Sequence, residues 1–158
     1  MRDRVLLWIH NAVPSYNPSE FCELIFTEDS ILILHYGWHL SERIWYPFKR
    51  RRRKMSAARR RDELEVEKAF IRMLLPARDI EAFRELAHRE TSLKYEEIER
   101  IEIGEGRKFL FICIKPFLKI WSRGRLFYYK IEEEEFEVLR RELEEISRIK
   151  GFELKIIS

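Results

Sequence analysis

Hydrophobic and polar positions alternate most clearly between residues 22 and 40. The pattern predicts two strands, Cys22 to Thr27 and Ser30 to Leu40, joined into a hairpin by a tight turn at Glu28 and Asp29. Side chains two positions apart share one face of a strand. One face of the second strand is expected to be core, and it carries Leu32, Leu34, Tyr36, Trp38 and Leu40. The opposite face carries Ile31, Ile33, His35, Gly37 and His39.

Strand-like segments return after Tyr95. Glycines at 104, 106 and 124 mark turns between them, which is typical of an antiparallel meander. Four strands are predicted there: Glu97 to Ile103, Lys108 to Lys115, Phe117 to Trp121 and Leu126 to Ile131. A last strand is expected from Phe152 to Ile157, whereas the apolar run from Val5 to Ile9 fits either a strand or one helical turn.

Helical periodicity appears in three places. The clearest helix is predicted from Glu132 to Lys150, followed by Gly151 at the position where helices commonly end. Its apolar stripe consists of Phe136, Leu139, Leu143 and Ile146. A helix is also expected from about Ser56 to Leu75, where Pro76 stops it, and another from Asp79, a candidate N-cap, to about Arg89. The last two can fold as a helical hairpin.

These elements predict one α+β domain over residues 1–158. Its β-rich core covers 22–40 and 95–158 with the C-terminal helix, and 41–92 form a basic helical insertion. We expect a strongly bent antiparallel sandwich or roll capped by the C-terminal helix. The chain has 46% hydrophobic residues, enough for a sizeable core. Its charged fraction of 37% resembles hyperthermophile composition, in which surface ion pairs are common.

The order of these elements resembles the pleckstrin-homology-like superfamily, particularly its GRAM and prokaryotic branches. The resemblance rests on the hairpin ELIFTEDSILIL, the strand YEEIERIEI and the helix segment EFEVLRRELEEI, and it covers 22–40 and 95–150. The insertion at 41–92 and the strand after the helix depart from that pattern. The resemblance implies a non-catalytic module that binds lipid headgroups, peptides or partner proteins, although a fold alone does not fix the ligand.

The strongest functional signal is a basic segment, defined here as residues 49–61. It has nine basic residues and no acidic ones: Lys49, Arg50, Arg51, Arg52, Arg53, Lys54, Arg59, Arg60 and Arg61. The chain has 31 Lys and Arg against 28 Asp and Glu; without these nine, 22 face 28, and the net charge of +3 becomes −6. Arg59 to Arg61 also lie near the predicted N-terminus of a helix, where cations are unfavourable, so helix stability does not explain their placement.

Three interpretations of the basic segment remain open. It can bind nucleic-acid phosphates without sequence specificity. It can bind a membrane surface rich in acidic headgroups, which three interface aromatics just before it would suit: Trp45, Tyr46 and Phe48. It can also be a solvated segment that pairs with acids of the same chain, such as Glu132 to Glu135 and Glu144.

Other candidate chemistry is weaker. Cys22, His35 and His39 suggest a metal site, but residues four apart on a strand are about 13 Å apart, too far to share one ion, so His35 and His39 are interpreted as surface or half-buried sheet positions. Glu153 and Lys155 form the E-x-K pattern of some metal-dependent nucleases, without a matching upstream Asp on a core strand. We therefore expect no catalytic residues, no metal and no cofactor.

The two cysteines, Cys22 and Cys113, lie in apolar segments and are expected to be buried and reduced. The N-terminus shows no signal-peptide pattern, and the apolar windows are too short to cross a bilayer. The sequence thus predicts a cytoplasmic protein, with peripheral attachment to a membrane surface as an alternative location. Its predicted function is a non-catalytic interaction module with an anionic partner, and the alternative is a nucleic-acid-binding protein.

Overall fold

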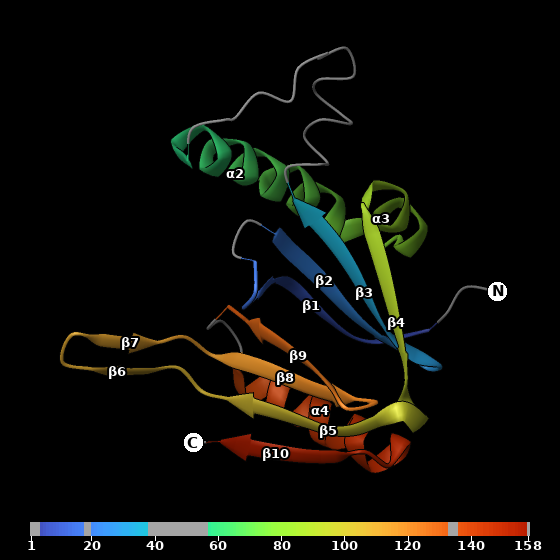
Figure 1. Cartoon of the computed structure of the whole chain (residues 1–158). Coiled ribbons are helices and arrows are strands. Elements are labelled where there is room, and N and C mark those ends of the chain that lie inside the picture. Colours follow the sequence, from blue (N-terminus) through green and yellow to red (C-terminus); the bar gives the residue numbers. More distant parts are fainter. Residues whose placement is uncertain (1–3, 18–19, 38–56, 133–135, 158) are drawn as a thin grey trace.

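The computed structural model describes residues 4–17, 20–37, 57–132 and 136–157, with positions 57–63 and 107–109 described by their backbone. Within these ranges the chain has a mixed α+β fold with one large, mostly antiparallel sheet (Figure 1). The sheet has eight strands in the order β10-β5-β8-β9-β1-β2-β3-β4. This confirms the α+β class and the mostly antiparallel sheet that the sequence predicts.

The strands follow one another mainly as antiparallel neighbours, and β10 is the exception because it runs parallel to β5. Their bounds are β1 Val5–Pro14, β2 Glu20–Thr27, β3 Ser30–Gly37, β4 Arg89–Lys94, β5 Ile98–Gly104, β8 Phe117–Ser122, β9 Arg125–Lys130 and β10 Glu153–Ile157. Two further strands, β6 Arg107–Phe109 and β7 Ile112–Ile114, pair only with each other.

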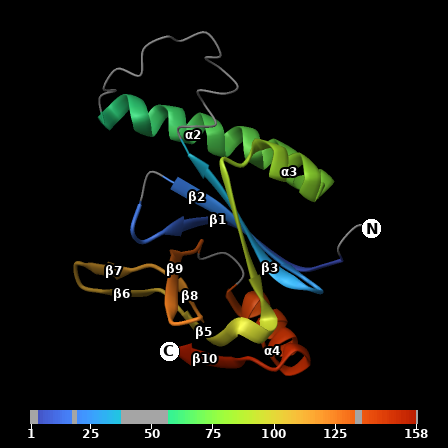
Figure 2. The same cartoon turned by 45° about the vertical axis from the view of Figure 1, so that its right-hand side comes forward.

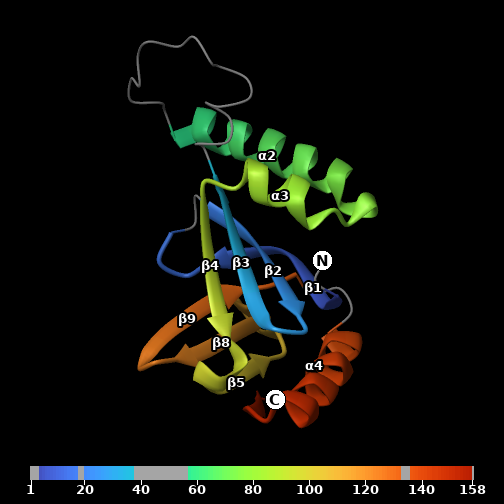
Figure 3. The same ribbon diagram turned by 90° about the vertical axis from the view of Figure 1, so that its right-hand side faces the viewer.

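Strand β1 joins the two halves of the sheet. It pairs with β2 along most of its length, but its end turns to pair with β9 through Val13 and Pro14. The register shifts between Ile9 and Ala12, and Asn11 in that irregular stretch has a φ of 56°. An irregularity of this kind bends a strand, and Asn tolerates the left-handed conformation better than most residues. The bend turns the β5-β8-β9 half across the β2-β3 half (Figures 1 and 3).

The core lies between these two halves. Leu24 and Ile33 from the first half and Ile101 and Ile120 from the second are fully buried in it. Helix α4, Phe136–Lys150, adds Leu143 and Ile146 to the same cluster, as the predicted apolar stripe requires. The helix ends before Gly151, whose φ of 84° is the left-handed conformation expected after a helix.

A second apolar cluster lies on the other face of β2 and β3. Helix α2 (Ala57–Leu74), the short helix η1 (Leu75–Ala77) and helix α3 (Ile80–Leu86) cover that face (Figures 2 and 3). Phe83 of α3 is fully buried there and packs against Trp8 and Tyr36. Both predicted helices are present, and the side chain of Asp79 accepts a hydrogen bond from the Glu81 N–H as expected of an N-cap. The second helix ends at Leu86 and not near Arg89, because the chain from Arg89 pairs with β3 as a strand.

Because β3 lies between the two clusters, both of its faces are buried. Leu32, Leu34 and Tyr36 face the helices, as expected of the predicted core face. The expectation for His35 is wrong: it is 2% exposed, neither at the surface nor half-buried. Helices that cover the outer face of a sheet turn an alternating pattern into a continuously buried strand.

The predicted strand from Lys108 to Lys115 is also wrong. The chain reverses at Leu110 and forms the β6-β7 hairpin, while β5 pairs directly with β8. Gly104 pairs with Phe117, whose ring fills the space where a Cβ on Gly104 would lie. Pro116, which has no N–H for a strand ladder, follows the hairpin, so the apolar run is divided before β8 begins.

Candidate anion-binding groove

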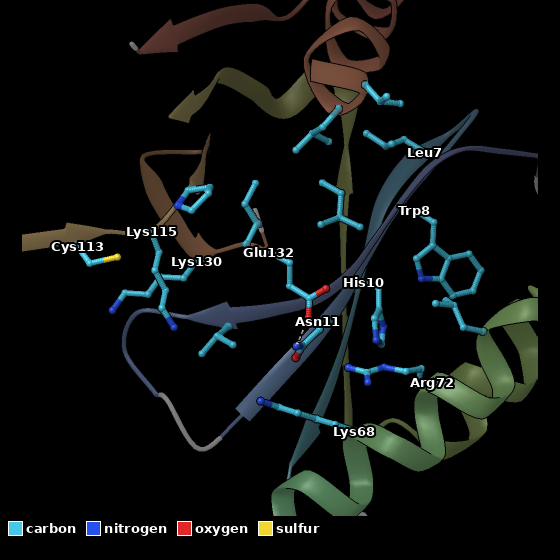
Figure 4. Close-up of a pocket in the computed structure, with 17 residues that line it drawn as sticks. Leu7, Trp8, His10, Asn11, Lys68, Arg72, Cys113, Lys115, Lys130 and Glu132 are labelled. Carbon is cyan, nitrogen blue, oxygen red and sulfur yellow. Dashed lines mark hydrogen bonds between the residues drawn. The ribbon is translucent and has the colours of Figure 1, made fainter. Parts of the chain in front are cut away.

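A groove of about 1030 Å³ runs beside β1, between helix α2 and the end of β9. Its lining comes from β1, α2, η1, the ends of β7 and β9 with the residues that follow them, and the start of α4 (Figure 4). The irregular stretch of β1 places His10 and Asn11 in its wall, while the packing of α2 on the sheet supplies the opposite side. The groove therefore exists because the insertion is folded against the domain.

The charge around this groove is mostly positive. Lys68 and Arg72 extend from α2, and Lys115 and Lys130 reach it from the β7-β8 and β9 side (Figure 4). Lys68 is 3.7 Å from a carboxylate oxygen of Glu65. In the described part of the chain, Arg72, Lys115 and Lys130 have no ion-pair partner. Side chains that are not neutralised by the protein are available to an anion from solution.

Two carboxylates moderate this charge. Glu132 lines the groove and accepts a hydrogen bond of 2.8 Å from Nδ2 of Asn11. Glu23 lies behind the wall with 0% exposure, where one oxygen contacts Nδ1 of His10 and the other accepts a 3.2 Å bond from the Asn11 N–H. Burial raises the pKa of Glu23, and the hydrogen bonds from His10 and Asn11 act in the opposite direction.

The contact with Glu23 orients the His10 ring. Its Nδ1 faces the carboxylate, and among the described residues its Nε2 has no hydrogen-bond partner. The Asn11 side-chain oxygen is likewise without one in this part of the chain. Imidazole can present either a lone pair or an N–H at Nε2, depending on its protonation. Both atoms are buried behind the groove surface, so the groove offers a ligand positive charge rather than these hydrogen-bonding atoms.

A second polar cluster surrounds His35. The Cys22 Sγ is 3.4 Å from Nδ1 of His35, and an Arg89 nitrogen is 3.2 Å from the same atom. Burial raises the pKa of the Cys22 thiol and lowers that of His35 to about 4. Both groups are therefore held neutral, which is unfavourable for a thiolate nucleophile. Among the described residues, no group of three or more metal-binding side chains comes together.

Most of the predicted binding residues lie outside the described ranges. These are Lys49, Arg50, Arg51, Arg52, Arg53 and Lys54, together with the aromatics Trp45, Tyr46 and Phe48. Arg59, Arg60 and Arg61 lie in the N-terminal part of α2. Glu153 and Lys155, the E-x-K pair, are exposed on strand β10 at the sheet edge. Cys113 lines the groove and is exposed, which corrects its expected burial.

The groove cations were not singled out in the sequence. Lys68, Arg72, Lys115 and Lys130 are isolated along the chain, and only the folded insertion brings them around one space. No run or spacing marks them. Because 37% of the residues are charged, four isolated Lys and Arg residues do not predict a binding site from the sequence alone.

No helix in the described ranges is long and apolar enough to cross a membrane. The sequence matches no family model. It also matches no curated protein sequence. Among solved structures it is similar to the hSac2 domain of the human phosphoinositide phosphatase Sac2, with 12% identity and a TM-score of 0.45, over 95% of this chain and 72% of that one. A likeness at this level establishes neither family nor function.

Proposed function

We propose that this protein is a non-catalytic binding module of the pleckstrin-homology-like type, which recognises an anionic partner. The groove between β1 and α2 and the basic segment at 49–61 together form its binding surface. The observation that carries the proposal is the convergence of Lys68, Arg72, Lys115 and Lys130 on one groove. Three of them lack an ion pair within the described ranges.

The position of α2 supports treating the groove and the basic segment as one surface. The basic segment runs directly into the N-terminal part of α2, and the same helix supplies Lys68 and Arg72 further along. A partner that contacts the segment can therefore follow the helix into the groove. A phosphate-rich partner fits best, because Arg and Lys bind phosphate oxygens through charge-assisted hydrogen bonds.

The state of the buried groups supports a binding role over covalent catalysis. Cys22 is the buried thiol next to an imidazole, the arrangement that a thiol nucleophile would use. However, burial favours its neutral form, and the lowered pKa of His35 makes that ring a weak base. The pair is better explained as a hydrogen-bonded contact within the core.

The test is binding of the purified protein to duplex DNA, single-stranded RNA and acidic liposomes, from about 50 to 300 mM salt. Two variants should weaken binding: Arg50 to Arg53 replaced by Ala, and the groove variant Arg72→Ala with Lys115→Ala. The matched control removes two exposed cations elsewhere, Lys94→Ala with Arg148→Ala. Equal losses in the groove variant and its control would show that only net charge matters and would contradict the proposal.

The choice of target separates the proposal from its nucleic-acid alternative. A protein dedicated to nucleic acid would retain duplex or single strand near physiological salt and lose this retention in the Arg50 to Arg53 variant, with liposomes unbound. For a phosphate-backbone contact, each lost cation should reduce the slope of log affinity against log salt by about one.

A further inference from the structure

The β6-β7 hairpin projects away from the sheet, and its tip is apolar (Figure 1). Leu110 and Phe111 form the two-residue turn, with exposed fractions of 85% and 102%. On β7, Ile112 is 63% exposed and Ile114 is 50% exposed. Single exposed apolar residues are common on proteins. Here four of five consecutive positions in a projecting hairpin are apolar and exposed, and a contiguous patch of this kind is typical of an interaction site.

The turn is unfavourable for its own backbone. Leu110 has a φ of 51°, a conformation that a branched, bulky side chain rarely adopts. The positive φ falls on the first turn residue and not on Phe111, and two-residue hairpin turns of this kind prefer Gly at the first position. Leucine is therefore a poor choice for the turn conformation, and both residues are poor choices for solvation. Strain and exposed apolar area at one tip together indicate a function outside the folded core.

Basic residues lie along the chain on both sides of this tip. Arg107 and Lys108 are in β6, and Lys115 directly follows β7. Lys115 also lines the groove, so the hairpin base and the anion-binding groove share a border. The N-terminal end of α2, where the basic segment ends, lies on the same side of the molecule as the hairpin (Figures 1 and 2).

We propose that the anionic partner is an acidic lipid bilayer, and that the Leu110-Phe111 tip inserts into it while the hairpin and groove cations contact headgroup phosphates. This inference rests on the proposed function and names its partner. Apolar side chains gain from entering the acyl region, and cations just behind them gain from the negative surface potential. The spatial order of apolar tip, then cations, matches the order of layers in a bilayer.

Charge and chemistry favour this partner over two others. A nucleic acid can stack a base on Phe111, but it offers nothing to Leu110, Ile112 and Ile114, which are aliphatic and make up most of the patch. A second copy of the chain would bring its own basic hairpin, with Lys115 at the base, next to the first. Like charges at an interface are unfavourable, so self-association through the tip is opposed.

The variant Leu110→Gly with Phe111→Asn tests the inference. It supplies the residues that a two-residue turn prefers, so the hairpin should remain folded while the apolar tip is lost. Sedimentation with phosphatidylcholine vesicles containing about 30% phosphatidylserine should show strong binding by the wild type. Binding by the variant should fall about tenfold or more, because the two apolar side chains that enter the acyl region of the bilayer are removed. Binding of both proteins to duplex DNA serves as the comparison.

Insertion itself is measured with a polarity-sensitive dye at the tip. The labelled protein is Phe111→Cys in a Cys113→Ser background, where the remaining Cys22 is buried. The control carries the dye at Glu145→Cys on the exposed face of α4. We expect a blue shift on addition of acidic vesicles, with quenching by lipid-borne quenchers, for the tip position only.

The vesicle, dye and DNA experiments together test the proposed insertion into a bilayer. Binding of acidic vesicles by the wild type, with a tenfold loss in the tip variant and a blue shift at position 111, supports it. Vesicle binding that the tip variant retains, or a dye that stays in water, overturns insertion but leaves the proposed anionic function standing. Retention of DNA without vesicles, or concentration-dependent dimers that the tip variant abolishes, overturns the lipid partner. Failure to bind any anionic target overturns both proposals.

Discussion

His10 on β1 contacts the carboxylate of Glu23 on β2 through its Nδ1, and this contact separates the groove from the interior. Glu23 has no solvent exposure, so the carboxylate depends on protein donors for its hydrogen bonds. His10 supplies one and the Asn11 N–H supplies the other. The pair thereby links the bend of β1 to the orientation of a groove side chain.

Replacement of Glu23 should destabilise the fold. The loss should be larger when the new side chain cannot accept the hydrogen bonds from His10 and Asn11. Glu23→Ala leaves the His10 ring and the Asn11 N–H without their acceptor and should lower the free energy of unfolding by about 3 kcal/mol. Glu23→Gln keeps an acceptor of the same size and should cost about 1 kcal/mol. Denaturant unfolding at pH 7 measures both. Similar losses in the two variants would show that the hydrogen bonds matter less than side-chain volume.

The pH dependence at His35 has a defined sign. Burial, followed by the charges of Arg89 and His88, lowers its pKa from 6.5 to about 4. The unfolded chain therefore binds this proton at higher pH than the folded protein does, and stability falls as pH decreases from 6.5 to 4. The contribution is about 3 kcal/mol over this window. The groups that face His35 are Glu20, Cys22, His88, Arg89, Thr91 and Arg125.

The matched variant is His35→Gln, which keeps polar atoms at the site and does not titrate. Its free energy of unfolding should change less than that of the wild type between pH 6.5 and 4. The difference between the two proteins isolates His35 from other groups, including Glu23, whose raised pKa gives the opposite sign. Parallel pH profiles for wild type and variant would exclude His35 as the source of acid sensitivity.

The insertion should unfold together with the sheet. Phe83 is fully buried against Trp8 and Tyr36, and the Tyr36 hydroxyl donates a 2.6 Å bond to the Phe83 carbonyl. Phe83→Ala should lower the free energy of unfolding by about 4 kcal/mol. Tyr36→Phe should cost about 1 kcal/mol, because the same carbonyl still accepts from the Ala87 N–H. If the insertion and the sheet unfold together, the unfolding transitions followed by near-UV and far-UV circular dichroism should coincide.

Hydrophobic periodicity correctly predicted the helices and strands whose apolar residues follow one period over many positions. Helix α4 and the β2-β3 hairpin fall close to the expected bounds because their apolar stripes match one period over many residues. Strand β4 was not predicted: Arg89–Lys94 has one buried apolar residue, Leu93, and its pairing with β3 decides its conformation. The β6-β7 hairpin was missed because its turn lacks Gly, Asn and Asp.

The candidate site was less predictable than the fold. The basic segment is visible in the sequence because its charges are consecutive, whereas the groove cations Lys68, Arg72, Lys115 and Lys130 meet only through tertiary packing. The burial of His35 follows from helices that cover one face of β3, together with the core on the other. The alternation along β3 indicates a strand with one buried face. It does not reveal that helices cover the other face of the sheet.

The strain at Leu110 leads to a prediction in which stability and binding change in opposite directions. Leu110→Asn should raise the free energy of unfolding by about 1 kcal/mol, because Asn adopts a positive φ more readily than Leu. The melting temperature should then rise by about 3 °C. Leu110→Ala, which removes apolar area but keeps the strained turn, should leave stability nearly unchanged. If the tip inserts into lipid, both variants should bind acidic vesicles more weakly than the wild type, so the loss of binding cannot be ascribed to a less stable protein.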